Sequence, residues 1–239
     1  MTADAVFFGA HPDDVELSSG GLAALLASHG HRVVVVDLTR GEAGSRGTAE
    51  ARHHEAQVAA GILGVERENL GLPDLGLLRG DHVQQRAVAA CLRRHRPRLV
   101  VAPDVDDLHP DHVEAAHLIT RVCYLSGLAK FDAPGERFRP ERFLYAIYRS
   151  VRAPHLIVDV SAVWEQRMEA VRAHRSQIDP EVEGPQTYLT APGFLAEVEA
   201  RARTWGAAIG ATHGEGYRVR GPVPVSDARA LLHGAGSGA

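Results

Sequence analysis

The sequence has no long apolar segment and no marked excess of one charge. No hydrophobic run approaches the ~18 residues that a membrane-spanning helix needs. The first ten residues, MTADAVFFGA, lack the basic start and the apolar stretch of a signal peptide. With 26 Lys and Arg against 30 Asp and Glu, the net charge of −4 gives no electrostatic footprint for nucleic acid or an anionic membrane. We therefore expect a cytoplasmic protein that binds a small molecule, with no nucleic-acid or membrane partner.

Cysteine motifs and a dinucleotide fingerprint are also missing. The two cysteines, Cys91 and Cys123, form no C-x-x-C pair, so their spacing indicates no metal or redox motif and we expect two buried thiols. The first apolar run is not followed by G-x-G-x-x-G, which argues against NAD binding. Asp37, near the end of the next apolar run, is interpreted instead as a strand-end residue that shapes a crevice.

Apolar runs alternate with amphipathic segments, the pattern of β-α-β units around a mostly parallel sheet. The length of 239 residues and the 45% hydrophobic content favour one domain over residues 1–239, with a frayed tail from about 231 to 239. We expect an α/β, Rossmann-like, doubly wound sheet with helices on both faces and strand order 3-2-1-4-5. The predicted strands are residues 5–8, 32–38, 69–72, 98–103, 142–148 and 155–160, and the predicted helices are 21–30, 48–64, 81–97, 109–127, 161–174 and 192–208.

Two similar motifs follow two of these strands. HPDD at 11–14 comes after the first strand, and HPDH at 109–112 comes after the fourth. In the expected order these strands are neighbours at the topological switch point, where ligands bind beyond the carboxyl ends of the strands. Imidazole together with carboxylate oxygen suits a divalent transition metal. The crevice should therefore collect a set of candidate site residues: His11, Asp13, Asp14, His109, Asp111 and His112.

Other interpretations of these motifs remain open. A single H-P-D tripeptide is most often a turn in which Pro fixes φ and Asp caps the next helix. Two histidines and one carboxylate leave a coordination position for water, as in a catalytic zinc site, but they also suit Fe(II) oxygen chemistry or a non-catalytic binding crevice. The remaining histidines are interpreted as ordinary surface or core residues: His29, His31, His53, His54, His82, His95, His117, His155, His174, His213 and His233.

The pairing of AHPDD with HPDH resembles the signature of the LmbE-like, or PIG-L type, N-acetylglucosaminyl deacetylases, which are zinc enzymes on a Rossmann-like fold. LTRGEAGSRGT, EARHHEA, LGLPD, VDVS, SQ at 176–177 and GEGY at 214–217 extend the resemblance over nearly the whole chain. They are similar to the branch that deacetylates N-acetylglucosaminyl-malate in bacillithiol synthesis. That branch commonly has an arginine before HPDH, where this sequence has Leu108.

The resemblance implies a role for the motif residues. His11, Asp14 and His112 match the zinc ligands of the family, and Asp13 matches its general base. A bound zinc ion lowers the pKa of a water, and the neighbouring carboxylate accepts its proton during attack on the acetamide. His109 matches the residue that stabilises the oxyanion and can also assist departure of the amine.

Asp111 and four further residues complete the predicted site. Asp111 is interpreted either as a carboxylate that orients an imidazole or as a helix N-terminal carboxylate favoured by the macrodipole. Arg52 matches the R-x-x-E-A position of the family and is a candidate for binding the substrate, because its planar fork suits a carboxylate. Arg46, Glu42 and Tyr188 are further substrate-binding candidates.

The predicted function is therefore zinc-dependent hydrolysis of the N-acetyl group of N-acetylglucosaminyl-malate, with one Zn²⁺ as cofactor and Fe²⁺ or another divalent metal as an alternative. A bacillithiol S-conjugate amidase, or a deacetylase of another N-acetylglucosaminide, would use the same groups with a different pocket. The resemblance also implies a homo-oligomer.

Overall fold

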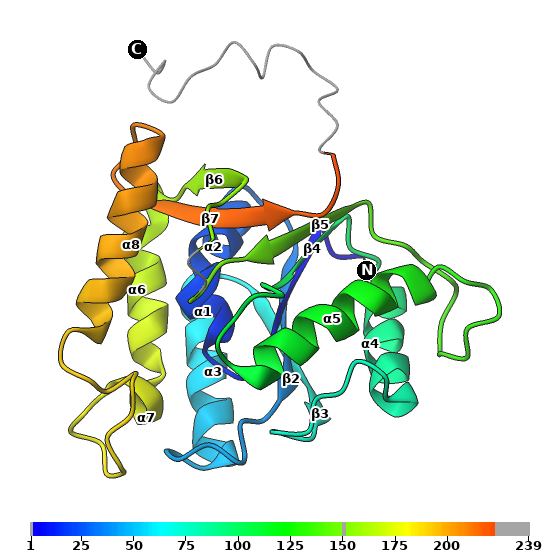
Figure 1. The fold of residues 1–239 in the computed structure, drawn as a ribbon, viewed down its shortest axis with the longest axis horizontal. Helices are drawn as coiled ribbons and strands as arrows, with labels where there is room; N and C mark the ends of the chain where they lie inside the picture. Colours follow the sequence, from blue (N-terminus) through cyan, green and yellow to red (C-terminus); the bar gives the residue numbers. More distant parts are fainter. Residues whose placement is uncertain (1, 150–151, 223–239) are drawn as a thin grey trace.

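The computed structural model describes residues 2–149 and 152–222 (Figure 1). Its centre is a seven-stranded sheet of order β3-β2-β1-β4-β5-β7-β6. The first five strands pair in parallel, whereas β7 is antiparallel to both β5 and β6. The predicted α/β class and the order 3-2-1-4-5 are therefore confirmed. The strands are β1 (Ala5–Gly9), β2 (Val33–Thr39), β3 (Glu66–Leu72), β4 (Leu99–Pro103), β5 (Arg142–Ala146), β6 (Leu156–Asp159) and β7 (Gly214–Val219).

Helices cover both faces of the sheet, as Figure 1 shows. Alternate residues of β1 separate the two layers, because successive strand side chains point to opposite faces. Phe8 packs in the core that includes residues of α4 and α5, and Phe7 packs in the core that includes residues of α2. The helices are α1 (Asp14–Ser18), α2 (Gly20–Ser28), α3 (Ala49–Leu63), α4 (His82–His95), α5 (Pro110–Leu125), α6 (Trp164–Ala173), α7 (Arg175–Ile178) and α8 (Phe194–Ala208), with a 3₁₀ turn at Ser161–Val163.

Local capping residues set the ends of the helices that lead to and from the site. The Asp81 side chain accepts a hydrogen bond from the backbone N–H of Gln84 at 2.9 Å, which confirms it as the N-cap of α4. Thr48 caps α3 through the N–H of Ala51, and Gly64 ends that helix in the left-handed conformation. These caps fix the residues at which α3 and α4 begin, and thus where the loops that follow β2 and β3 end.

Strand β7 is the main element that the sequence analysis missed. Its segment GEGYRV has no apolar alternation at its start, because glycines occupy two positions that would carry side chains. A Cβ at Gly214 would lie 2.7 Å from Ile157 of β6, and one at Gly216 would lie 3.0 Å from the Trp205 ring of α8. The glycines therefore let a strand and a helix approach closely, and this requirement weakens the hydrophobic pattern.

Two smaller predictions meet different outcomes. Cys91 is buried as predicted, whereas Cys123 is only partly buried because α5 lies at the surface there. The predicted tail at 231–239 and His233 fall outside the described residues. Within residues 2–149 and 152–222, no helix has the length and the apolar character needed to cross a membrane.

Candidate active site

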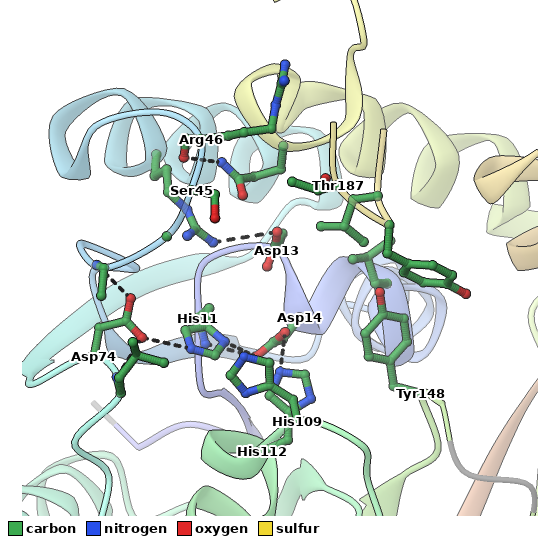
Figure 2. Close-up of a pocket in the computed structure, with 18 of the residues that line it drawn as sticks. His11, Asp13, Asp14, Ser45, Arg46, Asp74, His109, His112, Tyr148 and Thr187 are labelled. Carbon is green, nitrogen blue, oxygen red and sulfur yellow. Dashed lines mark hydrogen bonds and ion pairs between the residues drawn. The ribbon is translucent and has the colours of Figure 1, made fainter. Parts of the chain in front are cut away.

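A cavity of about 410 Å³ opens where β1 and β4 end, and both histidine motifs line it (Figure 2). The ring centroids of His11 and His109 are 4.9 Å apart, those of His109 and His112 are 4.8 Å apart, and those of His11 and His112 are 5.4 Å apart. HPDD and HPDH are 98 positions apart in the chain, yet they share one wall of the cavity. The strand order brings them together as the sequence analysis predicted.

Asp14 lies between two of these imidazoles. Its Oδ1 is 3.1 Å from Nε2 of His112, and its Oδ2 is 3.6 Å from Nδ1 of His11. Oδ2 also accepts the backbone N–H of His11 at 2.8 Å, which fixes the carboxylate at the start of α1. His11, Asp14 and His112 thus bring two ring nitrogens and a carboxylate together, the donor set predicted for a divalent metal. His109 offers a third nitrogen, since ligand atoms of the three histidines lie within 4.8 Å of one another.

The nitrogen of each ring that faces away from Asp14 contacts another carboxylate. Nε2 of His11 lies 3.0 Å from Oδ1 of Asp74, and Nδ1 of His112 lies 3.1 Å from Oδ1 of Asp107. Metal-binding histidines usually donate their second N–H to such a group, which fixes the tautomer and turns the other nitrogen toward the ion. This arrangement is the observation in the structure that fits a bound metal.

Asp111 lies near a histidine ring, as predicted for a carboxylate that orients an imidazole. Its Oδ2 lies 3.5 Å from Nε2 of His11 and accepts the backbone N–H of Leu75 at 2.8 Å. It is also in the first turn of α5, so the two interpretations of this carboxylate are compatible. It nevertheless contacts His11 less closely than Asp74 does, and Asp107 is the carboxylate that contacts His112.

The field of these carboxylates favours positive charge in the cavity wall. Burial opposes a charged ring, but Asp14 and Asp107 raise the pKa of His112 to about 9. Burial also acts to lower the pKa of His11, yet Asp111, Asp14 and Asp74 together raise it well above its ordinary value. Although burial acts in the opposite direction, the two histidines hold the pKa of Asp14 well below its usual range. A divalent cation bound here would satisfy the same field.

Asp13 differs from Asp14 in both backbone and surroundings. Its φ of 121° lies in a region that non-glycine residues rarely adopt, and such strain concentrates at functional sites. Its carboxylate lines the cavity, where Figure 2 labels it. One carboxylate oxygen lies 3.6 Å from Nη2 of Arg52. Burial raises the pKa of Asp13 to about 6, with Arg52 acting to lower it and Asp14 to raise it. The two adjacent carboxylates therefore occupy different environments.

His109 is the N-cap of α5, and this position determines which nitrogen it can use. Its Nδ1 accepts the backbone N–H of Asp111 at 3.2 Å, so the proton of the neutral ring is on Nε2. Burial and the charges of His112 and His11 lower the pKa of His109, which favours this neutral form. The ring therefore presents an N–H donor at the cavity.

The two predicted substrate-binding arginines have their guanidinium groups bound to the protein. Arg52 donates from Nη1 to the Gly41 carbonyl at 3.1 Å and from Nη2 to the Pro12 carbonyl at 2.9 Å. It lines the cavity beside Asp13, so these contacts favour a role in holding the strained turn over the predicted substrate contact.

Arg46 lines the cavity, as a site residue should, but its guanidinium is held by the protein. Its side chain is buried and points into the loop after α7, where its nitrogens donate to backbone carbonyls of Ser176, Asp179, Val182 and Pro185. Its donors are used in this way, so Arg46 holds the loop that forms one side of the cavity. The sequence could not show this, because the four carbonyls lie 130–139 residues away in the chain.

Glu42 and Tyr188 also have protein partners. Glu42 accepts the backbone N–H of Asp74 at 3.0 Å and is not among the residues that line the cavity, so it supports the loop that carries Asp74. Tyr188 does line the cavity, and its hydroxyl donates to Glu197 at 2.6 Å. The guanidinium of Arg149 lies 3.9 Å from the centre of the Tyr188 ring, on the same side of the cavity.

Several residues of the site were missed in the sequence. Asp74 lies in the LGLPD segment, two residues after β3, and Asp107 lies between the end of β4 and His109. Neither stands in a histidine motif, although its place after a strand end was a usable signal. Tyr148 and Arg149 follow β5, the next strand along the sheet, and line the cavity. The rule that ligands bind beyond strand ends would have pointed to this pair.

A row of buried polar groups lies behind Asp13. Asp37 lies near the end of β2, as predicted, but it does not line the cavity, and its carboxylate accepts two hydrogen bonds from Arg67 at 2.8 Å. Arg67 also pairs with Glu16, and Oε2 of Glu16 lies 3.3 Å from Nε2 of His174. His174 is fully buried and is therefore part of the support beneath the site.

Comparison with known proteins agrees with this geometry. The family model described as "PIG-L: GlcNAc-PI de-N-acetylase" matches residues 6–123, which include both motifs. Diacetylchitobiose deacetylase of Thermococcus kodakarensis is 30% identical over 185 residues, which are 72% of this chain and 69% of that protein. This chain belongs to the PIG-L family.

Two further relatives extend the match. A crystal structure of the conserved protein TT1542 from Thermus thermophilus is 37% identical, with a TM-score of 0.86 over 95% of this chain and 99% of that one. 1D-myo-inositol 2-acetamido-2-deoxy-alpha-D-glucopyranoside deacetylase of Saccharomonospora viridis is 29% identical and covers 81% of this chain and 91% of that protein. The predicted family is confirmed, and deacetylase chemistry on an N-acetylglucosaminyl substrate is supported.

Proposed function

We propose that this member of the PIG-L family is a zinc-dependent hydrolase that removes the acetyl group from N-acetylglucosaminyl-malate. The observation that carries the chemistry is the arrangement of His11 and His112 around Asp14, with Asp74 and Asp107 behind the two rings. His11, Asp14 and His112 would hold the ion. Nitrogen and carboxylate donors with an open side suit catalytic zinc.

The chain's own residues supply the proton transfers. A bound zinc ion polarises a carbonyl oxygen and lowers the pKa of a water molecule. Asp13 accepts the proton of the water that adds to the acetamide carbon. The Nε2–H of His109 donates to the oxygen on which negative charge develops. Asp13 then returns its proton to the nitrogen as the C–N bond breaks, so acetate and the free amine leave.

The position of Arg149 favours a substrate that carries a carboxylate. It lines the cavity, its guanidinium stacks on Tyr188, and none of the contacts among the described residues pairs it with a carboxylate of the protein. Arg46 and Arg52 instead donate to backbone carbonyls. A stacked arginine keeps its planar edge available for a bidentate contact. We therefore assign recognition of the malyl group to Arg149, in place of Arg52 or Arg46.

The test compares two substrates and two proteins. Acetate release is measured from N-acetylglucosaminyl-malate and from a neutral methyl glycoside of N-acetylglucosamine, under air without reductant and with the metal content determined. The wild-type protein should prefer the malyl substrate. Arg149→Gln should lose ~10 to 150-fold in kcat/KM on that substrate, because a contact to a charged group is worth ~1.5–3 kcal/mol, and should keep its rate on the neutral one.

Other outcomes point to the alternatives. Equal rates on both substrates, unchanged in Arg149→Gln, would leave the deacetylase and remove the malate assignment in favour of another N-acetylglucosaminide. Cleavage of a bacillithiol S-conjugate at a higher rate would identify an amidase. A requirement for Fe(II) with oxygen, or no turnover by metal-loaded protein, would contradict the hydrolase itself.

A further inference from the structure

We propose a second metal site, formed by Glu68, Cys91 and His95, that takes a thiophilic divalent cation such as Zn²⁺. The site joins strand β3 to helix α4, and none of its residues lines the active-site cavity. Cys91 and His95 are four positions apart on α4, so their side chains lie on one face of the helix, one turn apart. Glu68 comes from β3, the strand beneath that face.

The three side chains already converge. Sγ of Cys91 lies 3.1 Å from Oε1 of Glu68, and Nε2 of His95 lies 3.2 Å from Oε2. One ligand atom from each residue lies within 4.8 Å of the others. Tetrahedral zinc at ordinary bond lengths separates sulfur from oxygen by about 3.6 Å and nitrogen from oxygen by about 3.4 Å. Small rotations of the side chains therefore suffice to enclose an ion.

Burial distinguishes this cluster from a surface ion pair. Cys91 is fully buried and His95 is 7% exposed. Nε2 of His95 is a buried nitrogen that faces Glu68 without forming a hydrogen bond of good geometry. An unsatisfied buried polar atom costs stability, and a metal ion would satisfy it. The unsatisfied nitrogen of His95 therefore supports a bound ion independently of the convergence of the three side chains.

The surroundings suit a cation with three protein ligands. Arg94 donates to both oxygens of Glu68, at 2.7 and 2.9 Å, and holds the carboxylate toward α4. About half of the Arg94 side chain is exposed, so its guanidinium can turn to solvent when Glu68 binds an ion. Burial and the neighbouring Glu68 raise the pKa of Cys91, so the thiol is protonated in the absence of metal. Binding therefore releases one proton from Cys91 to the buffer.

Sulfur, nitrogen and oxygen donors together select zinc or a similar borderline ion over magnesium or calcium. The expected effect is structural, because the backbone carbonyl of His95 also accepts the N–H of Ala3 at 2.7 Å. An ion at this position would tie the last turn of α4 to β3 and to the segment that enters β1. This inference uses no residue of the catalytic set and does not depend on the proposed function.

The experiment uses Co²⁺ as the probe, because cobalt bound to a thiolate gives a charge-transfer band in the near ultraviolet. Metal-free full-length protein, kept reduced with a phosphine, is titrated with Co²⁺, and bound metal is counted after equilibrium dialysis. The wild-type protein should bind two equivalents and show the thiolate band. The catalytic donor set has no sulfur, so the band reports only the second site.

Variants assign the band to its residues. Cys91→Ser should lose the band and one equivalent, whereas Cys123→Ser, the matched control, should keep both. Asp14→Ala should lose one equivalent and keep the band. His95→Gln should weaken the second site as Cys91→Ser does, and it replaces that variant if the serine protein does not fold. Folded wild-type protein that binds one equivalent without a thiolate band would overturn the proposal, as would a band that persists in Cys91→Ser.

Discussion

The guanidinium of Arg52 lies 3.6 Å from the carboxylate of Asp13, and both side chains are almost completely buried. Arg52 also donates to the carbonyls of Pro12 and Gly41, so one side chain of α3 ties together the loops after β1 and β2. Asp13 has a φ of 121°, and the residue before it is the one that Arg52 holds. The position of the proposed base therefore depends on a contact from another element.

Gly41→Ala tests this dependence. A Cβ at Gly41 would lie 2.1 Å from Nη1 of Arg52, and the glycine has a φ of 66°. Displacement of Arg52 should lower turnover, by as much as ~10²-fold if the base moves by about 1 Å. The measurement is kcat together with the free energy of unfolding.

Gly30→Ala is the control for backbone strain alone. Gly30 has a φ of 82° and no atom within 4 Å of an added Cβ. It should cost ~1–2 kcal/mol of stability for the left-handed conformation and leave turnover unchanged. Equal effects of the two variants on kcat would remove the role assigned to Arg52.

Asp14→Ala and Asp13→Asn should separate metal binding from catalysis. Asp14 lies between two imidazoles, so its removal should abolish metal binding at this site. Asp13→Asn should retain the metal but lose ~10² to 10⁴-fold in kcat, the usual contribution of a general base. Metal content and kcat are measured on the same preparations. Loss of metal in Asp13→Asn with metal retained in Asp14→Ala would exchange the roles of ligand and general base.

His109→Ala should lower kcat by ~10² to 10³-fold, because it removes an N–H donor to the developing oxyanion. Its metal content should stay that of the wild type, since Asp14 completes the ligand set without it. His109 is close enough to His11 and His112 to serve as a ligand. Loss of one metal equivalent in His109→Ala would show that His109 is a metal ligand.

Asp74→Asn and Asp107→Asn should weaken metal binding without removing it. Each carboxylate contacts the outer nitrogen of one histidine of the proposed metal site, and removal of such a partner typically costs ~10 to 100-fold in affinity. The measurement is competition with a chelating indicator. Asp111→Asn is the comparison, and it should cost less than Asp74→Asn because its contact with His11 is longer, at 3.5 Å. A larger effect at Asp111 would make it the main partner of His11.

Acid should destabilise the metal-free protein partly through Glu68. Despite burial, which acts the other way, His95 and Cys91 lower the pKa of Glu68 from 4.5 to about 2. A depressed pKa gives stability that is present above the unfolded value and is lost as the pH falls toward the folded value. The difference in unfolding free energy between wild type and Glu68→Gln should therefore shrink as the pH falls from about 5 toward 2. Urea unfolding at several pH values measures it, and a difference independent of pH would contradict the prediction.

The meeting of the two histidine motifs could be predicted because the ends of the strands can be recognised in the sequence. Continuous apolar runs mark β1 and β4, and the parallel order places their carboxyl ends at one edge of the sheet. His11, Asp14 and His112 then meet through topology alone, without knowledge of any loop. The weak apolar pattern of β7 shows the limit of this reasoning, because close packing against β6 and α8 requires glycine at two of its positions.

The chain sequence was sufficient for the fold class, the family and the residues that follow β1 and β4, because periodic hydrophobicity and strand-end motifs are local. The partners of the long charged side chains were decided only in the folded molecule. Arg46 and Arg52 carry flexible stems, and their guanidinium groups bind the carbonyls that loop paths bring within reach. Asp74 meets His11 for the same reason, and Glu68 meets Cys91 and His95 through packing of a helix on a strand. Such contacts depend on where distant segments lie, and no spacing in the sequence encodes that.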